Sequence, residues 1–261
     1  MQNIISTESV LEYRQGADVA PVPLWRRAFQ NIGFYFRIMS GKKSRLVTEI
    51  QSGHKYSIVF PCDKTATEAA NEMALRAFGK ANYIPASVIE LWRKKNPKLL
   101  SVLVDSNSSC RGYFDLLPLK EQFYKSFMRG EKVEEDITAD VIMGPDQEPT
   151  HLYIGGVTST DGNPIIGSLL LTSMLLKIRY LYLPNNKKPI TIGALAATED
   201  GEYYLKEFGF QEALVSKGMR KDGMTFYERE ITKADIDEHL DEWGRRSKFL
   251  DYSAYRWYMV R

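Results

Sequence analysis

The pattern of hydrophobic and polar residues in the middle of the chain predicts a strand, a tight turn and a long helix. Residues 151–158 are rich in β-branched and aromatic side chains, as strands are, and the turn-forming residues 161–164 follow them. Residues 167–183 are then largely apolar, and no helix breaker interrupts them before Pro184. Because proline cannot continue a helix, we expect the helix to end there.

A second strand and a second helix are predicted directly afterwards. Residues 190–197 have the apolar character of a buried strand, and residues 199–208 have helical spacing. Gly209 can adopt the left-handed conformation that closes many helices, so Phe210 is expected to open the next strand. The order strand, helix, strand, helix is typical of a mixed α/β domain.

Similar patterns predict the rest of this domain. The expected strands, in chain order, are residues 55–60, 99–105, 110–117, 213–218 and 224–231. A helix is expected at residues 65–78, between the first two strands, and the last two strands would form a hairpin turned at residues 221–223.

The turn before the long helix has the features of an anion-binding site. Backbone N–H groups at a helix start have no partner within the helix, and the helix dipole places about half a positive charge there. A pyrophosphate suits such a position. The donors predicted for it are Gly162, Ile166, Gly167 and Ser168. An ordinary strand-to-helix turn, with Ser168 as the capping residue, explains the same residues and stays open as an alternative.

The order of the elements between residues 55 and 231 resembles that of the GNAT acetyltransferase superfamily. Gly112-Tyr113 and the nearby Leu117-Pro118-Leu119 are similar to a stretch common in these proteins. Residues 203–210, which end in Phe208-Gly209-Phe210, resemble the closing helix of the family and its exit. The resemblance is one of pattern and order along the chain.

The resemblance implies an α/β fold with a mixed, mostly antiparallel sheet of about six to seven strands flanked by helices. It also divides the chain into three parts. Residues 55–231 would form the GNAT-like domain, residues 1–54 an N-terminal extension, and residues 232–261 a C-terminal helix with an aromatic and basic tail. Both extensions are expected to contain a helix.

An acetyl-CoA-dependent N-acetyltransferase is the function that the resemblance implies. The amine of the acceptor, which is a small molecule, a protein or an aminoacylated RNA, would attack the thioester directly. By the same resemblance, the backbone of Gly155, Gly156 and Val157 would pair with the pantetheine arm of acetyl-CoA. No metal is expected, since Cys62 and Cys110 have neither a CxxC partner nor a nearby pair of histidines.

Two departures from the family pattern concern these sites. The phosphate loop of the family is usually Gln/Arg-x-x-Gly-x-Gly/Ala, and residues 164–169 retain only its central glycine, Gly167. Many relatives place a tyrosine four residues before the glycine of the exit, where this chain has Leu205. The adjacent Tyr204 is our candidate for the group that protonates the leaving thiolate. Neighbouring helical positions point about 100° apart, so a rotated or shifted helix is required.

His151 is the candidate for the catalytic base. It is the one histidine near the expected acceptor cleft, and a neutral imidazole is a good proton acceptor near pH 7. Tyr153, Glu199 and Asp200 are the other polar candidates. Structural alternatives remain open: His151 as a polar residue at a strand start, and the two acids as charges favoured by the helix dipole.

The two flanks combine aromatic and basic residues. Residues 24–39 are predicted to form a basic, amphipathic helix, and residues 232–243 a helix that starts at Thr232 and is broken at Gly244. Aromatic residues among basic ones can stack on nucleic-acid bases and pair with phosphates. The alternatives are packing against the main domain and, for the aromatic tail, a contact between the two chains of a homodimer.

Composition and the longest apolar run limit the class of protein and the location that are expected. The chain has 261 residues, a formal net charge of +2 and 44% hydrophobic residues, so it is not a polycation and is large enough for a substantial core. Residues 169–183, the longest apolar run, contain Lys177 and Arg179 and are too short to span a bilayer. The first residues lack a signal-peptide pattern, which favours the cytoplasm.

Three classes of function follow from these patterns. The first is the acetyltransferase. The second is a GNAT-like fold that has lost catalysis and serves as a binding or regulatory module, which the incomplete phosphate loop favours. The third is a nucleic-acid-associated protein that uses the basic aromatic flanks, and its binding would weaken with salt. The acetyltransferase is our working hypothesis.

Overall fold

The computed structural model describes residues 34–38, 45–50, 55–79, 84–160, 164–183, 188–213 and 220–247. Their strands form one nine-stranded sheet, which has helices on both faces. The strands are β1 (Phe34–Ile38), β2 (Arg45–Ile50), β3 (Lys55–Val59), β4 (Leu100–Asp105), β5 (Cys110–Pro118), β6 (His151–Ser159), β7 (Ile190–Leu195), β8 (Gln211–Glu212) and β9 (Phe226–Ile231). The helices are α2 (Lys64–Phe78), α3 (Ala86–Lys95), α4 (Glu121–Met128), α5 (Pro164–Lys177), α6 (Glu199–Glu207) and α7 (Lys233–Ser247). A 3₁₀ turn lies at Glu134–Asp136 and a π-helical segment at Ile178–Tyr182.

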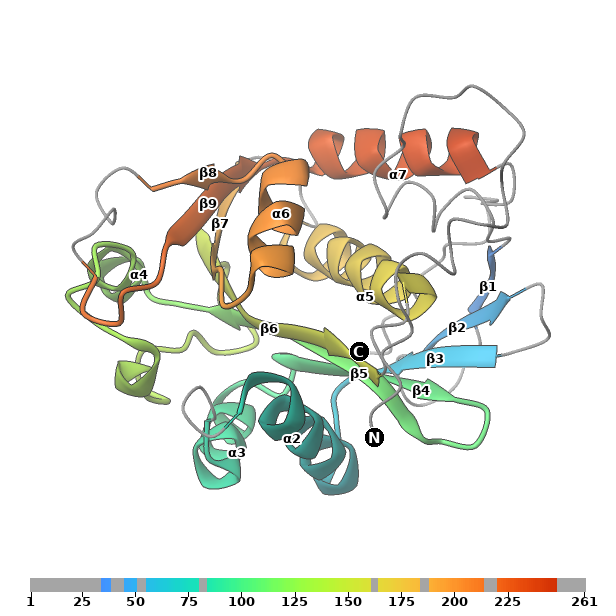
Figure 1. The fold of residues 1–261 in the computed structure, drawn as a ribbon, viewed down its shortest axis with the longest axis horizontal. Helices are drawn as coiled ribbons and strands as arrows, with labels where there is room; N and C mark the ends of the chain where they lie inside the picture. Colours follow the sequence, from blue (N-terminus) through green and yellow to red (C-terminus); the bar gives the residue numbers. More distant parts are fainter. Residues whose placement is uncertain are drawn as a thin grey trace.

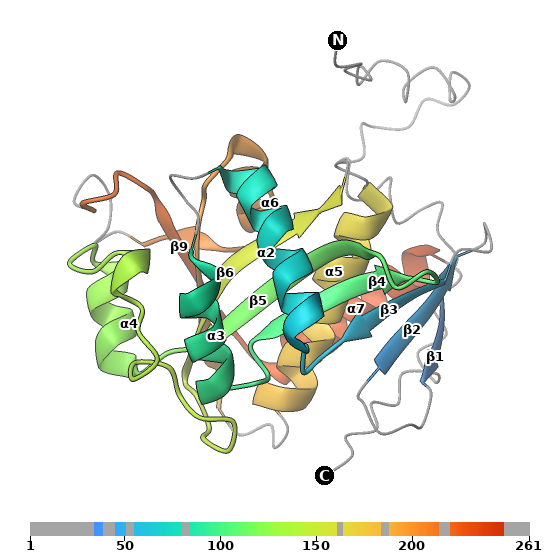
Figure 2. The same cartoon turned by 90° about the horizontal axis from the view of Figure 1, so that it is seen from below.

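The sheet is mixed and mostly antiparallel, with the strands in the order β1-β2-β3-β4-β5-β6-β7-β9-β8. Among the described pairs, β6 and β7 alone run parallel. Helices α2 and α3 cover one face, and α5, α6 and α7 lie over the other (Figure 1). Figure 2 shows α2 and α3 in front of the central strands. The predicted fold class is confirmed, and residues 55–231 supply the seven strands β3 to β9.

Strand β5 shows why the two faces of the sheet have separate cores. Phe114 and Leu116 are fully buried on the α5 side, in one hydrophobic cluster. Tyr113 and Leu117 belong to the clusters on the opposite side, where α2, α3 and α4 pack. Because successive side chains of a strand alternate between its faces, one apolar strand contributes to both cores. Each large apolar side chain buried in this way contributes about 1.5–3 kcal/mol to stability.

The structure corrects the prediction for the N-terminal flank. Phe34–Ile38 is the strand β1 rather than part of a helix over residues 24–39, whose other residues lie outside the described part. Its sequence, Phe-Tyr-Phe-Arg-Ile, is aromatic and β-branched, which favours a strand when a partner is present, and β2 is that partner. β2 in turn pairs with β3, so part of residues 1–54 belongs to the same sheet as the predicted domain.

The predicted C-terminal helix is present, but it ends later than expected. α7 follows Thr232 and continues to Ser247 through Gly244, the residue that the sequence predicts to break it. A glycine inside a helix costs only about 1 kcal/mol, which the neighbouring turns can outweigh. The aromatic tail after residue 247 lies outside the described part.

Helix α5 begins earlier than its sequence pattern predicts. It starts at Pro164 and not at Gly167, because proline suits the first helical position, where its missing N–H would have no partner. After Lys177 the helix continues as the π-helical segment. Of the predicted hairpin, the strand β9 is present, and it pairs with β7 and with β8 at Gln211–Glu212. Residues 214–219 of the other predicted strand lie outside the described part.

A lysine is fully buried in the core between α5 and the sheet. The ammonium of Lys177 donates hydrogen bonds to the backbone oxygen of Leu99, 3.0 Å away, and to the hydroxyl of Ser101, 2.7 Å away. It also lies 5.2 Å and 5.3 Å from the ring centres of Phe60 and Phe114. Burial lowers the pKa of Lys177 from 10.5 to about 7, because the charged form loses its hydration. This polar group ties α5 to the start of β4.

A reciprocal pair of hydrogen bonds closes the first turn of α7. The hydroxyl of Thr232 accepts from the Asp235 N–H at 3.1 Å, and the Asp235 carboxylate accepts from the Thr232 N–H at 2.6 Å. Thr232→Ala is expected to lower the free energy of unfolding by about 1 kcal/mol, measured by urea denaturation. Thr232→Ser retains the hydroxyl and should unfold almost as the wild type does. An equal loss in both variants would contradict a capping role.

Candidate functional site

Strands β6 and β7 part in the middle of the sheet. They pair in parallel over residues 151–154 of β6 and 191–194 of β7. β6 then continues to Ser159, whereas β7 ends at Leu195 and leads into α6. No described strand pairs with β6 on this side after residue 154. The backbone N–H and C=O groups on this edge of residues 155–159 are therefore available to an extended ligand.

A β-bulge marks the same point on the other side of β6. The register between β5 and β6 shifts after Asp115, so that Gly155 has no residue opposite it. A Cβ at Gly155 would lie 2.3 Å from Asp115 Oδ1, and a Cβ at Gly156 would lie 3.0 Å from the Tyr113 hydroxyl. Both glycines therefore face the same side of the sheet, and at Gly155 the close approach of Asp115 leaves no room for a side chain.

The chain passes from β6 to α5, whose first turn holds most of the predicted phosphate donors. Ile166 is buried in the core, and a Cβ at Gly167 would meet nothing within 4 Å. Because α5 begins at Pro164, the N–H groups of Gly167 and Ser168 bond within the helix, and Ile166 has one of the N–H groups that point out of its end. Gly162 and the side chain of Ser168 lie outside the described part.

A cavity of about 70 Å³ lies on the opposite face of the sheet, beneath α2 and α3, and reaches the bulge. Gly155 forms part of its lining. Polar side chains from the sheet and the 3₁₀ turn also line it, namely Tyr113, Asp115, Glu134 and Tyr153, and the helices add Thr67, Asn71 and Arg93. The cavity thus brings together polar groups from β5, from β6 and from the 3₁₀ turn, beside the point at which β6 and β7 part.

The two carboxyl groups of the cavity are in an unusual electrostatic environment. Burial and the negative charge of Glu134 raise the pKa of Asp115 to about 7, although the N–H groups of Gly155 and Gly156 act in the opposite direction. Burial also raises the pKa of Glu134, whose carboxylate accepts a hydrogen bond from the Tyr153 hydroxyl. Oδ1 of Asp115 is buried and has no hydrogen-bond partner among the described residues. Asp115 is therefore a proton acceptor whose charge changes near neutral pH.

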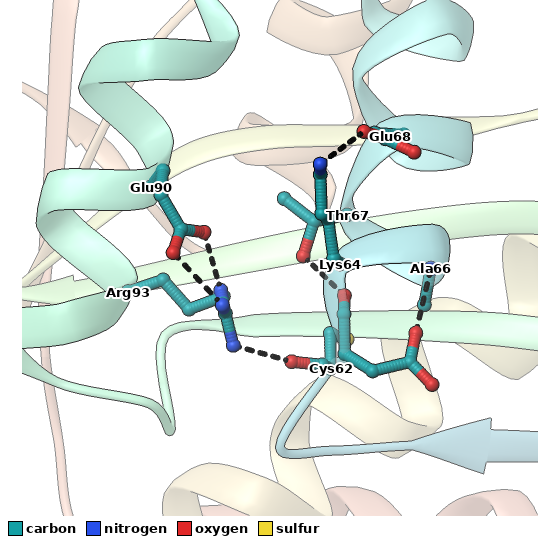
Figure 3. A network of polar contacts seen from close by, with 8 residues as sticks. Cys62, Lys64, Ala66, Thr67, Glu68, Glu90 and Arg93 are labelled. Atoms are coloured by element: carbon teal, nitrogen blue, oxygen red, sulfur yellow. Dashed lines mark hydrogen bonds and ion pairs between the residues drawn. The ribbon is translucent and has the colours of Figure 1, made fainter.

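One cation, Arg93 of α3, also belongs to the lining of the cavity, but its hydrogen bonds point elsewhere. Figure 3 shows its guanidinium bound to both carboxylate oxygens of Glu90, at 2.8 and 3.0 Å, and to the backbone oxygen of Cys62, at 3.0 Å. These bonds tie α3 to the start of α2, where Asp63 caps the helix by accepting from the Ala66 N–H. Arg93 thus fixes the walls of the cavity, and its charge is balanced by Glu90.

His151, the predicted base, lies away from this cavity. It is at the paired end of β6, three residues and about 10 Å before the point where the strands part. It lines a separate groove beside α4 and β9, where its ring centre lies 4.6 Å from that of Tyr124 and its Nδ1 lies 2.8 Å from the Thr150 hydroxyl. Burial lowers the pKa of His151, so the imidazole is neutral at pH 7. The structure does not bring His151 together with Asp115.

Tyr204, the predicted proton donor, lies on α6, the helix that follows β7. It is half-buried, and burial raises its pKa, so the phenol is protonated at neutral pH. Its ring centre is 5.8 Å from that of Tyr203. Glu199 and Asp200 occupy the first turn of α6, where the helix dipole favours acids. Of the polar candidates from the sequence, Tyr153 is the one that lines the cavity.

Sequence reasoning missed the two acids of the cavity. Asp115 interrupts the run of large hydrophobic and aromatic residues at 113–117, and a charged residue inside such a run is the signal that identifies it. Glu134 stands in a run of acids, and nothing in the sequence distinguishes it from Glu135 or Asp136. The two meet because the segment after α4 packs back against the sheet, which a local pattern does not encode.

Metal and membrane sites are not seen in the described part of the chain. No group of three or more His, Cys, Asp or Glu side chains there could hold a metal ion together. No helix there is long and apolar enough to cross a membrane. Cys62 and Cys110 are free thiols.

Comparisons with known proteins give matches in structure. No protein-family model and no curated protein matches the chain. One similar solved structure is Ard1 from Thermoplasma volcanium, at 13% sequence identity and a TM-score of 0.45, covering 67% of this chain and 97% of that one. GNAT-family acetyltransferases from Staphylococcus aureus and Listeria monocytogenes are each 14% identical with a TM-score of 0.43. They cover 67% and 69% of this chain, and 98% and 96% of their own.

The order of the elements leads to the same fold without these matches. From β3 to β9 the strands and helices follow the order that the resemblance to the GNAT superfamily implies. The parallel pair, β6 and β7, consists of the strands predicted at residues 151–158 and 190–197. The resemblance is thereby confirmed at the level of the fold.

Proposed function

We propose that the chain is an acyl-CoA-dependent N-acetyltransferase, which transfers an acetyl group from acetyl-CoA to an amine. The parting of β6 and β7 carries this proposal, because it leaves an edge of extended backbone inside one sheet, next to the start of a helix. A pantetheine arm contains two amides and can add to that edge by main-chain hydrogen bonds, as peptide strands add to sheet edges. The resemblance to the GNAT superfamily supports the same ligand.

The groups around this edge fit acetyl-CoA. The residues proposed to pair with its pantetheine arm are Gly155, Gly156 and Val157. The residues proposed to surround its pyrophosphate are Gly162, Ile166, Gly167 and Ser168. The first turn of α5 contains no acidic residue, so its dipole favours an anion, and Gly167 leaves open space beside it.

The reaction requires that the amine loses a proton and that the leaving thiolate gains one. The amine nitrogen attacks the carbonyl carbon of the thioester, the C–S bond breaks, and backbone N–H groups of β6 would stabilise the negative oxygen that forms. Tyr204 is proposed to protonate the thiolate, since its raised pKa keeps the phenol protonated. His151 lies at the paired end of β6, so it is proposed to act only through a water relay.

Acetyl-CoA is expected to raise the melting temperature, and Gly167→Glu is expected to cancel most of that rise. A ligand at 100 times its Kd stabilises the folded state by about 2.7 kcal/mol, which is roughly 5–10 °C for a chain of this size. A glutamate at position 167 would enter open space and place a negative charge beside the pyrophosphate. Because the helix dipole favours an acid there, the variant without ligand should be as stable as the wild type.

Gly167→Gln is the matched control, since glutamine has the same size without the charge. We expect the glutamate variant to lose affinity for acetyl-CoA by about tenfold or more relative to the glutamine variant. Thermal unfolding over a series of acetyl-CoA concentrations measures this difference. Equal affinity in the two variants would remove the pyrophosphate from this helix end. No stabilisation of the wild type at millimolar acetyl-CoA would refute the proposed function itself.

A binding or regulatory module without catalysis is the second candidate function. The incomplete phosphate loop, and Leu205 in place of the expected tyrosine, favour it. It predicts that acetyl-CoA stabilises the protein but that no CoA thiol is released when amines are added. A thiol reagent in the same titration separates the two functions.

A further inference from the structure

The cavity beside the bulge combines an apolar wall with an excess of acid. Asp115 and Glu134 face it, together with the hydroxyls of Tyr113 and Tyr153. Arg93 is the one cation among the lining residues that the structure describes, and its charge is balanced by Glu90. The apolar part of the lining includes Phe78, Ile84, Ile89, Trp92, Leu99 and Leu117.

In the described part of the chain, no cation of another element forms a hydrogen bond or ion pair with Asp115 or Glu134. Arg220 lowers the pKa of Glu134, but its guanidinium is bound to Asp222. Lys177 acts on Asp115 from the opposite face of the sheet, where its own hydrogen bonds are made within the core. Oδ1 of Asp115 is buried without a hydrogen-bond partner in the described part of the chain. A buried acceptor without a donor is unfavourable, so the cavity should attract a ligand that donates hydrogen bonds.

We propose that this cavity binds the acceptor, and that the acceptor carries a primary ammonium group on an alkyl chain. The proposal rests on the proposed function for its chemistry, whereas the binding itself requires no acetyl-CoA. An ammonium group has three N–H donors, which Asp115 and Glu134 can accept. Gly155 belongs both to the lining of the cavity and to the free edge of β6, so the amine and the thioester would meet at the bulge.

The size and lining of the cavity limit the class of amine. Its volume of about 70 Å³ is several times the roughly 10–15 Å³ that is needed to hold one water molecule. It therefore has room for an ammonium group and the first carbons of an alkyl chain. The remainder of the alkyl chain would contact apolar lining residues such as Ile84 and Trp92, where burial of each CH₂ group is favourable.

Asp115 is placed to accept the proton that the amine must lose. One proton passes from the ammonium to the ionised carboxylate of Asp115, which becomes a neutral acid, and the nitrogen keeps the electron pair with which it attacks. A base works best when its pKa is near the operating pH, and burial raises the pKa of Asp115 to about 7. Asp115 thereby receives the proton of the amine first, and His151, at the paired end of β6, would receive it afterwards through the water relay.

The test is the binding of n-butylammonium to the CoA-free protein, measured by calorimetric titration at pH 7. We expect binding in the millimolar range, and a loss of about tenfold or more in Asp115→Asn, which keeps the shape of the side chain and removes its charge. Butan-1-ol lacks the charge and tetramethylammonium lacks N–H donors for Asp115 and Glu134, so both should bind at least as weakly as n-butylammonium binds to that variant. Equal binding of tetramethylammonium would overturn the class of amine proposed.

Proton release gives a readout that a purely structural Asp115 would not change. A cation beside the partly protonated carboxyl expels part of a proton, which titrations in two buffers of different ionisation enthalpy detect. We expect this release in the wild type and its absence in Asp115→Asn. Should that variant fail to fold, Glu134→Gln is expected to weaken n-butylammonium binding as well. Undiminished binding in the folded variants, or no binding to the wild type, would overturn the proposal.

The experiments distinguish a failure of the acceptor assignment from a failure of the proposed acetyltransferase function. Binding of n-butylammonium without any stabilisation by acetyl-CoA would retain the cavity as a cation site and reject the acyl transfer. Stabilisation by acetyl-CoA without binding of n-butylammonium would reject the acceptor assignment alone.

Discussion

Lys177→Met is expected to remove most of the increase in stability that the wild type shows between pH 7 and pH 10. In the unfolded chain this lysine has its ordinary pKa, near 10.5, whereas burial in the folded protein lowers the pKa to about 7. Between these values the unfolded state binds more protons, so the stability of the wild type rises with pH. The interval between the two pKa values corresponds to a free energy on the order of 5 kcal/mol.

Urea denaturation of both chains at pH 7, 8, 9 and 10 measures this effect as a difference between them. The raised pKa values of buried tyrosines such as Tyr113 change stability in the opposite direction at high pH in both chains, whereas the raised pKa of Cys62 also depends on the charge of Lys177, which lowers it. At pH 7 methionine should be tolerated, because a hydrophobic side chain of similar volume replaces a poorly solvated charge. Lys64→Met is the control, since that side chain is exposed. Parallel pH curves for wild type and Lys177→Met would show that Lys177 is not the group responsible.

Gly193→Ala is expected to destabilise the fold by about 3 kcal/mol, by overpacking the core beneath the parting strands. A Cβ at this position of β7 would lie 2.3 Å from Phe226 Cζ and 2.5 Å from the Tyr124 hydroxyl. Both side chains are fully buried, and the Phe226 ring packs edge-on against Phe127 at 5.7 Å, so it has no space into which to move. The expected fall in melting temperature, followed by circular dichroism, is roughly 6–12 °C.

Gly167→Ala is the matched control for that substitution. A Cβ at position 167 would meet nothing within 4 Å, and alanine is a better helix former than glycine. It should therefore stabilise the protein by about 0.5–1 kcal/mol. A Gly193→Ala variant as stable as Gly167→Ala would show that β7 can move away from the aromatic cluster. The spacing between β6 and β7, on which the proposed site depends, would then not be fixed by this packing.

Local periodicity was sufficient to predict the central elements, because each of them buries apolar residues against a core and therefore carries a hydrophobic pattern in its own sequence. β3 to β7 and α2, α5 and α6 lie within a few residues of their predicted positions. Boundaries were less accurate where a terminal residue has more than one role. Pro164 can end a turn or begin a helix, and Gly244 can end a helix or be carried inside one. The aromatic run Phe34–Ile38 formed a strand because β2 was there to pair with it.

The candidate site was harder to predict than the fold, since it depends on which residues meet across the sheet. The sequence indicated Gly155 and Gly156 through the resemblance, and the structure shows the packing around them. It did not indicate that Asp115 would face Gly155, because the register between β5 and β6 shifts at that point. Strict alternation along β6 would also place Gly155 and Gly156 on opposite faces. Only a three-dimensional register reveals that both face the same side of the sheet.

The bulge at Gly155 also determines how β6 can change in length. Before the bulge, the even-numbered residues Leu152 and Ile154 pack in the core beneath α5, and after it the odd-numbered Val157 does so. The positions whose side chains face the α5 core thus change from even-numbered to odd-numbered at a single extra residue. Removing Gly155, or inserting one residue elsewhere in β6, would exchange the inward and outward faces of the strand on one side of the change. We therefore expect homologous and designed sequences to differ freely in the identity of many residues of β6, while keeping its residue count unchanged.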